Sequence, residues 1–133
     1  MGKAKYIKAD VYRRGICIFI GTKKELYDWA KKTFNSESDE TLIHDLKEDL
    51  TNTTSIGTTY SLGMGESLVW LPKLSLTPKG IGNLVHELSH ATMGLLDFVG
   101  VEYHYSGANE PYTYLLEFFV TKALEKRGYK NVG

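Results

Sequence analysis

Two histidines and a glutamate stand close together in the sequence, as His86-Glu87-Leu88-Ser89-His90. In a helix, residues four apart lie on one face, about 6 Å apart along the axis, so two imidazoles can reach one metal ion. Imidazole is a good ligand for Zn²⁺. Glu87 lies one position round the helix, beside the metal and not on it. The motif therefore predicts a zinc site in which His86 and His90 are ligands and Glu87 takes a proton from activated water.

A catalytic zinc needs a third protein ligand and an open coordination position. The acidic candidates downstream are Asp97, Glu102, Glu110 and Glu117. Asp97 lies seven residues past His90 on the same expected helix, about 10 Å away, which is too far to share the metal. Glu110 begins the next expected helix, which a short connection would bring back antiparallel to the first. We therefore predict Glu110 as the third ligand, with Glu102 in the connecting loop as an alternative.

The helix that carries the motif has clear start and stop signals. Thr77-Pro78 starts it, with Thr as the cap and Pro at the first helical position. We expect it to run to about Phe98, with Gly100 as the stop. Asn109 is expected to cap a last helix that has Pro111 in its first turn and ends at Gly128.

Strands and helices alternate in the rest of the chain. We expect two strands at 6–11 and 15–20, a helix opened by the capping box Thr22-Lys23-Lys24-Glu25, and a second helix over 42–50. Further strands at 56–62 and 67–71 flank a glycine-containing turn at 63–66. The order ββα(α)ββαα predicts one α+β domain over residues 1–133. Its small, twisted, mostly antiparallel sheet would pack on the motif helix and the helix that follows.

Composition narrows the classes of partner. The chain has 133 residues with 16 Lys and Arg against 16 Asp and Glu, so its formal charge is zero and neither a nucleic acid nor a membrane is an expected partner. The single cysteine, Cys17, lies in the apolar run 16–20, which predicts a buried, inert thiol. That run is too short for a signal peptide or a membrane span, so a cytoplasmic protein is expected. We expect His44 on the surface, without a partner at ligand spacing.

The metal motif and its spacing to Glu110 are similar to those of a known enzyme family. His86-Glu87-x-x-His90, followed after nineteen residues by Glu110 within Gly107-Ala108-Asn109-Glu110, resembles the motif of the zincin metallopeptidases of the thermolysin-like, or gluzincin, group. In that group the third ligand is a Glu that follows an Asn at this spacing. The chain is also similar to short zincin-like proteins of bacteriophages and prophages, in which Tyr follows that Glu four residues later, as Tyr114 does here. The resemblance covers residues 67–125.

The resemblance implies an activity and a metal. It implies one Zn²⁺ per chain, held by His86, His90 and Glu110, with Glu87 as the general base for the hydrolysis of a peptide or protein substrate. It also implies that the strand at 67–71 is the edge strand that holds the substrate.

Two residues are candidates for stabilising the oxyanion of the transition state, Tyr114 and His104. Tyr114 stands where thermolysin-like enzymes have an Asp that orients the first histidine. This departure favours an alternative, a non-catalytic zinc-binding protein of the same fold that acts as a phage-type interaction or assembly protein. A metal-dependent hydrolase with a substrate other than a peptide is a weaker third hypothesis.

Overall fold

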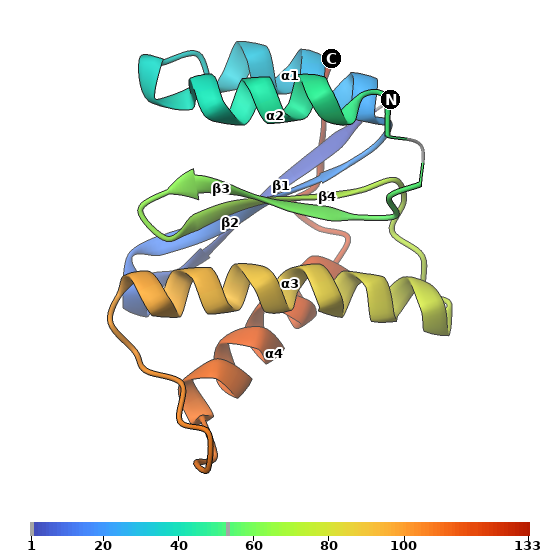
Figure 1. Cartoon of the computed structure of the whole chain (residues 1–133). Helices are drawn as coiled ribbons and strands as arrows, with labels where there is room; N and C mark the ends of the chain where they lie inside the picture. Colours follow the sequence, from blue (N-terminus) through green and yellow to red (C-terminus); the bar gives the residue numbers. More distant parts are fainter. Residues whose placement is uncertain (1, 53) are drawn as a thin grey trace.

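A five-stranded sheet with helices on both faces forms the body of the computed structural model, which describes residues 2–52 and 54–133 (Figure 1). The strands are β1 (Lys3–Ala9), β2 (Arg14–Ile20), β3 (Thr58–Gly63), β4 (Glu66–Leu71) and β5 (Lys130–Asn131). The helices are α1 (Lys23–Thr33), α2 (Glu40–Asp49), α3 (Pro78–Phe98) and α4 (Glu110–Leu124), with 3₁₀ turns η1 (Asp10–Tyr12) and η2 (Glu37–Asp39). The sheet order is β3-β4-β2-β1-β5. β2 and β4 are parallel and the other neighbours are antiparallel, which confirms the expected α+β fold with a mostly antiparallel sheet.

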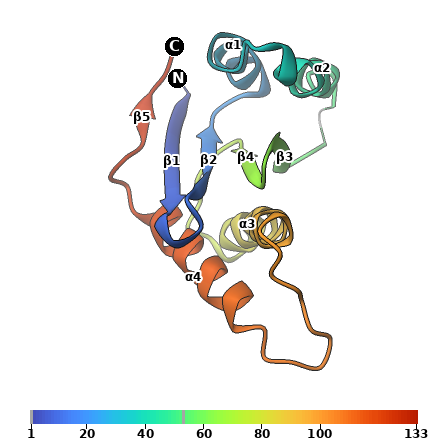
Figure 2. The same ribbon diagram turned by 90° about the vertical axis from the view of Figure 1, so that its left-hand side faces the viewer.

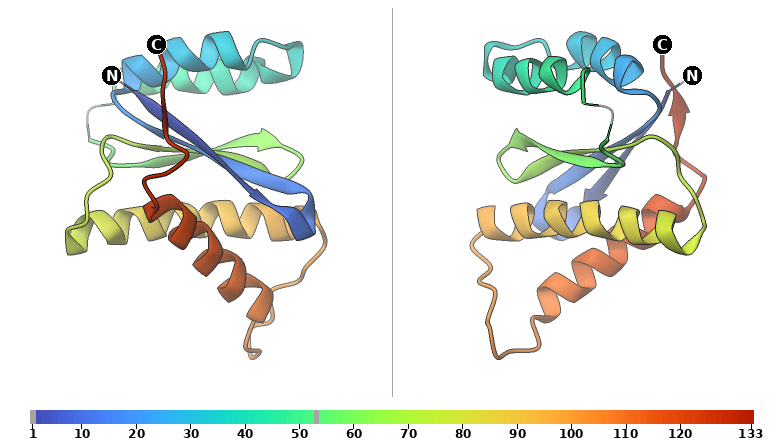
Figure 3. Two further views of the ribbon diagram at one scale, coloured as in Figure 1. Left: turned by 180° about the vertical axis from the view of Figure 1, so that it is seen from behind. Right: turned by 45° about the vertical axis from the view of Figure 1, so that its right-hand side comes forward.

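The helices cover the sheet in two pairs. α1 and α2 lie over one face, while α3 and α4 lie under the other (Figures 1 and 2). Seen from behind, α4 crosses α3 obliquely below the strands (Figure 3). The sheet is therefore buried on both sides, and each face needs its own hydrophobic core.

Alternation along the two central strands supplies both cores. In β2, Ile16 and Ile18 pack toward α3 and α4, whereas Cys17 and Phe19 pack toward α1 and α2. β4 follows the same pattern. Its residues Val69 and Leu71 pack toward α3 and α4, whereas Leu68 and Trp70 pack toward α1 and α2. Successive side chains of a strand point to opposite faces, so a strand buried on both faces has a continuous apolar sequence.

The helix signals predicted from the sequence are confirmed where they concern α1 and α3. Thr22 and Glu25 form the expected capping box at the start of α1. The Thr77 hydroxyl accepts a hydrogen bond from the backbone N–H of Gly80 at the start of α3. Gly100, with φ of +83°, ends α3 in a Schellman arrangement in which the N–H of Val101 bonds to the carbonyl of Leu96.

The edge of the sheet differs from the prediction. The strand at 67–71 was expected to be an edge strand, and this is wrong, because β4 lies between β3 and β2. Its residues Ser67 to Leu71 are buried on both faces, which is typical of an interior strand. The free edge next to α3 belongs to β3, which joins β4 through a tight turn with positive φ at Met64 and Gly65.

The C-terminal end also differs from the prediction. α4 ends at Leu124 and not at Gly128. Gly128, with φ of +97°, instead lies in the turn that leads to β5, a two-residue strand that pairs with β1 and was not predicted. A strand this short has no periodic signal to read from the sequence.

Two further expectations bear on chemistry and location. Cys17 is buried, as predicted, and burial raises the pKa of its thiol to about 12, which disfavours the reactive thiolate. In the part of the chain that the structure describes, no helix has the length and the apolar character needed to cross a bilayer.

A buried lysine joins β1 to the end of α4. The Lys5 ammonium donates hydrogen bonds to the backbone carbonyls of Lys122 and Glu125, and lies 5.0 Å from the centre of the Tyr129 ring. Burial lowers the pKa of Lys5. The last carbonyls of a helix have no partners within the helix, so this side chain serves as a C-terminal cap.

Replacing Lys5 with methionine should therefore destabilise the protein. Lys5→Met keeps most of the apolar stem but leaves the carbonyls of Lys122 and Glu125 without this donor, at an expected cost of about 1–3 kcal/mol in the free energy of unfolding. Urea denaturation followed by circular dichroism measures the change. Lys3→Met, at an exposed position of the same strand, is the control and should change stability by less than about 0.5 kcal/mol. Equal effects of the two substitutions would contradict the capping role.

Candidate metal site

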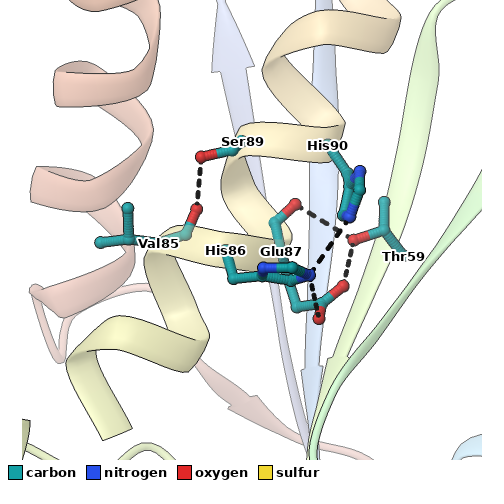
Figure 4. Close-up of polar contacts among 6 residues, drawn as sticks. All are labelled: Thr59, Val85, His86, Glu87, Ser89 and His90. Carbon is teal, nitrogen blue, oxygen red and sulfur yellow. Dashed lines mark hydrogen bonds and ion pairs between the residues drawn. The ribbon is translucent and has the colours of Figure 1, made fainter. Parts of the chain in front are cut away.

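The two histidines of the motif lie side by side on the outer surface of α3. The Nε2 atoms of His86 and His90 are 3.3 Å apart, and their rings are nearly perpendicular, at 82° (Figure 4). Two nitrogens that bind zinc at about 2.0–2.1 Å with a tetrahedral angle would be about 3.3–3.4 Å apart. The imidazole pair therefore has the spacing that a shared zinc ion requires. Both residues are exposed, so an ion can reach them from solvent.

The Glu87 side chain lies on the side of the histidine pair that faces the sheet, between α3 and β3. Its side chain is only 11% exposed, compared with 68% for His86. One carboxylate oxygen, Oε1, accepts a hydrogen bond of 2.9 Å from the Thr59 hydroxyl, while Oε2 lies 3.9 Å from Nε2 of His86 (Figure 4). The carboxylate thus stands beside the imidazole pair without entering it, as a general base would.

The motif lines a groove of about 680 Å³ between α3 and the β3–β4 hairpin. One wall is the face of α3 from His86 to Phe98, and the other is formed by β3 and its turn into β4. Glu87 lies in this groove with both histidines. Because β3 is the edge strand of the sheet, its backbone N–H and C=O groups that point away from β4 are available to form hydrogen bonds with a bound chain.

The structure does not bring Glu110 to the histidines. Glu110 and Tyr114 line a separate cavity of about 460 Å³, between the first turn of α4 and the segment Lys8–Tyr12. Both are exposed. The connection 101–109 extends away from the body before α4 begins, so the chain returns at a distance from the motif (Figures 1 and 2). The role of Glu110 as third ligand stays a prediction. It requires the connection 101–109 to take a different path, one that brings Glu110 to the histidine pair.

The loop before α4 is closed by one side chain. Asn109 accepts a 2.7 Å hydrogen bond from the backbone N–H of His104 and donates to the carbonyls of His104 and Gly107. Asn109 stands at the N-cap position of α4, as expected, but it adopts a left-handed conformation and its side chain makes no capping bond to that helix. His104 is exposed in this loop and does not line the groove that holds the histidine pair.

The other acidic candidates divide between the groove and the surface. Asp97 lines the groove, at its far end from His86, while Glu102 and Glu117 are exposed elsewhere.

Within residues 2–52 and 54–133, one group of three possible ligand side chains has its ligand atoms within 4.8 Å of one another. This group lies on α2 and consists of His44, Asp45 and Glu48. All three are exposed, as expected for His44, although its partner Glu48 at 3.1 Å was missed. Exposed pairs of this i,i+4 type form without a metal.

Thr59 is the groove residue that sequence reasoning missed. Its contact with Glu87 depends on β3 lying against α3, and no spacing along the chain indicates that two segments 28 residues apart will meet. Comparisons with known protein families, with curated proteins and with solved structures gave no match.

Metal binding should depend on the histidine pair. We expect the wild type to bind one Zn²⁺ per chain, and His86→Ala or His90→Ala to weaken binding by more than about 100-fold, because each removes a direct ligand. Competition with a chromophoric chelator measures the affinity, and elemental analysis gives the stoichiometry. His44→Ala is the control and should bind zinc like the wild type.

The same assay tests the third ligand. Glu110→Ala should also weaken zinc binding. Unchanged affinity in that variant would contradict the assignment of Glu110 and leave Glu102 or another oxygen donor as the third ligand.

Proposed function

We propose that this protein is a zinc-dependent metallopeptidase that hydrolyses peptide bonds. The observation that carries the proposal is the 3.3 Å approach of the His86 and His90 nitrogens beside a nearly buried carboxylate, Glu87, in an open groove. Two imidazoles and an adjacent carboxylate base are the donor set of hydrolytic zinc sites.

The residues present fit a zinc ion by the chemistry of their donors. His86 and His90 would hold it through Nε2, and Glu110 is the proposed third ligand. Bound zinc would act as a Lewis acid that polarises the substrate carbonyl and lowers the pKa of water to about 7. Glu87 contributes no ligand atom in this scheme, because it lies on the sheet side of the pair.

Glu87 is the proton carrier of the proposed reaction. Its Oε2 faces the imidazole pair and takes a proton from the attacking water as the new C–O bond forms. The same oxygen then gives that proton to the nitrogen of the leaving amine as the C–N bond breaks. The carboxylate is therefore regenerated, and one water is consumed for each bond cleaved.

The edge strand β3 gives the groove a place for an extended peptide. A substrate backbone can add to the free edge of β3 by main-chain hydrogen bonds, which positions a peptide bond beside the motif. This gives β3 the substrate-holding role that the resemblance to thermolysin-like enzymes implied for the strand at 67–71.

A non-catalytic zinc-binding protein is the second candidate function. It is favoured by the positions of Glu110, Tyr114 and His104, which lie outside the groove that holds the histidine pair. In such an interaction or assembly protein the metal would be structural. The two candidates differ in whether Glu87 is needed for turnover.

Replacement of the base tests the proposal directly. Glu87→Gln should bind zinc as the wild type does and should cleave peptides at least about 100-fold more slowly, because the amide cannot accept the proton. Cleavage of a fluorescence-quenched peptide library measures the activity. Glu117→Gln, the same change at an exposed position of α4, is the matched control. Equal cleavage by Glu87→Gln and the wild type would exclude Glu87 as the base, and a zinc-loaded wild type without cleavage would favour the second candidate.

A further inference from the structure

The Glu87 carboxylate is held by a residue of the opposite wall of the groove. The Thr59 hydroxyl lies 2.9 Å from Oε1 of Glu87 and 3.1 Å from the backbone oxygen of the same residue (Figure 4). A hydroxyl has one proton to donate, and the shorter contact is to the charged oxygen, which is the stronger acceptor. This contact assigns Oε1 to Thr59 and leaves Oε2 facing the imidazole pair.

The register of β3 fixes Thr59 in this position. Its neighbour Tyr60 is buried on the opposite face of the sheet, where the Tyr60 hydroxyl donates a 2.6 Å hydrogen bond to Asp49 of α2. Since successive side chains point to opposite faces, Tyr60 on the α2 side places Thr59 on the α3 side. A slip of one residue would bring Tyr60 into the groove and remove it from its core.

A glycine two residues before Thr59 leaves room for the same carboxylate. A Cβ atom at Gly57 would lie 3.1 Å from Cγ and 3.3 Å from Oε2 of Glu87. These distances are tighter than ordinary van der Waals contact, so any larger residue would push against the carboxylate. Gly57 therefore provides the space that the Glu87 carboxylate fills, and Thr59 holds the carboxylate in that space.

We propose that Thr59 is a positioning residue for the general base, which orients the Glu87 carboxylate so that Oε2 exchanges the proton. This inference rests on the proposed peptidase function and deepens it. Thr59 contacts neither of the histidines in the described contacts and acts through Glu87. A base that is fixed before substrate binds loses less entropy in the transition state. Removal of the hydroxyl should therefore lower kcat and leave KM nearly unchanged.

The test compares two substitutions at one position. Thr59→Val has nearly the same shape as threonine but lacks the hydroxyl, and Thr59→Ser keeps the hydroxyl. Using the library peptide that the wild type cleaves best, we expect Thr59→Val to lower kcat by about 10- to 100-fold, and Thr59→Ser to restore most of the loss. Zinc affinity should stay the same in both. Wild-type kcat in Thr59→Val, while Glu87→Gln is inactive, would overturn the positioning role and leave the proposed function standing.

Thr92→Val is the matched control for the loss of a hydroxyl. Thr92 is a buried residue of α3, and its hydroxyl donates a 2.8 Å hydrogen bond to the carbonyl of Leu88, outside the groove. It should keep the wild-type kcat. An equal loss of kcat in Thr92→Val and Thr59→Val would indicate general loosening of α3, and would contradict a specific role for Thr59.

A second readout does not depend on turnover. In crystal structures of the zinc-loaded wild type and Thr59→Ser, the Glu87 carboxylate should have one orientation, with Oε1 on the hydroxyl. In Thr59→Val it should rotate or occupy several orientations. An unchanged carboxylate in Thr59→Val would refute the positioning role whether or not the wild type cleaves peptides. Absence of zinc binding by the wild type would instead refute the proposed function on which that role rests.

Discussion

The groove depends on the nearly buried carboxylate of Glu87, which lies between α3 and the sheet. Burying the side chain of Glu87 costs free energy unless its oxygens have hydrogen-bond partners. Thr59 supplies one partner from β3, and Gly57 leaves the space that the carboxylate fills. Among the described residues no buried side-chain nitrogen or oxygen lacks a partner. The edge strand and the motif helix are thus matched to one another through this one side chain.

The packing of α3 against the sheet explains why the histidines are exposed. Along α3, positions 86 and 90 lie on the solvent side, while Leu84, Leu88 and Leu95 pack into the core below the sheet. Since the core residues fix the rotation of the helix, they also fix which way the imidazoles face. The hydrophobic core and the proposed metal site therefore use different faces of one helix, and Glu87 lies at the boundary between them.

The sequence predicted correctly the features whose signals lie within a few neighbouring residues. The capping residues Thr22 and Thr77 and the stop at Gly100 act within one turn of helix, so they define α1 and α3 correctly. The interior position of β4 depends on a parallel pairing with β2 across α1, α2 and β3, and no local pattern encodes that pairing. The Thr59–Glu87 contact is non-local for the same reason. The position of Glu110 was inferred from helix-return geometry, and the nine residues of 101–109 allow α4 to begin away from the histidines.

The two ends of α4 are held very differently, and this bears on how Glu110 could reach the proposed zinc site. The later turns of the helix bury Phe119 and Ala123, and the Lys5 ammonium donates hydrogen bonds to the carbonyls of Lys122 and Glu125 at the end of the helix. In the first turn Glu110 and its neighbours are mostly exposed, and Tyr112 makes the main link to the connection, through its 3.2 Å hydrogen bond to the carbonyl of Val101. Segments with few buried contacts open at low free-energy cost. A change in the start of α4 therefore need not disturb the core, whereas a shift of α3 would displace both hydrophobic packing and the Glu87 carboxylate.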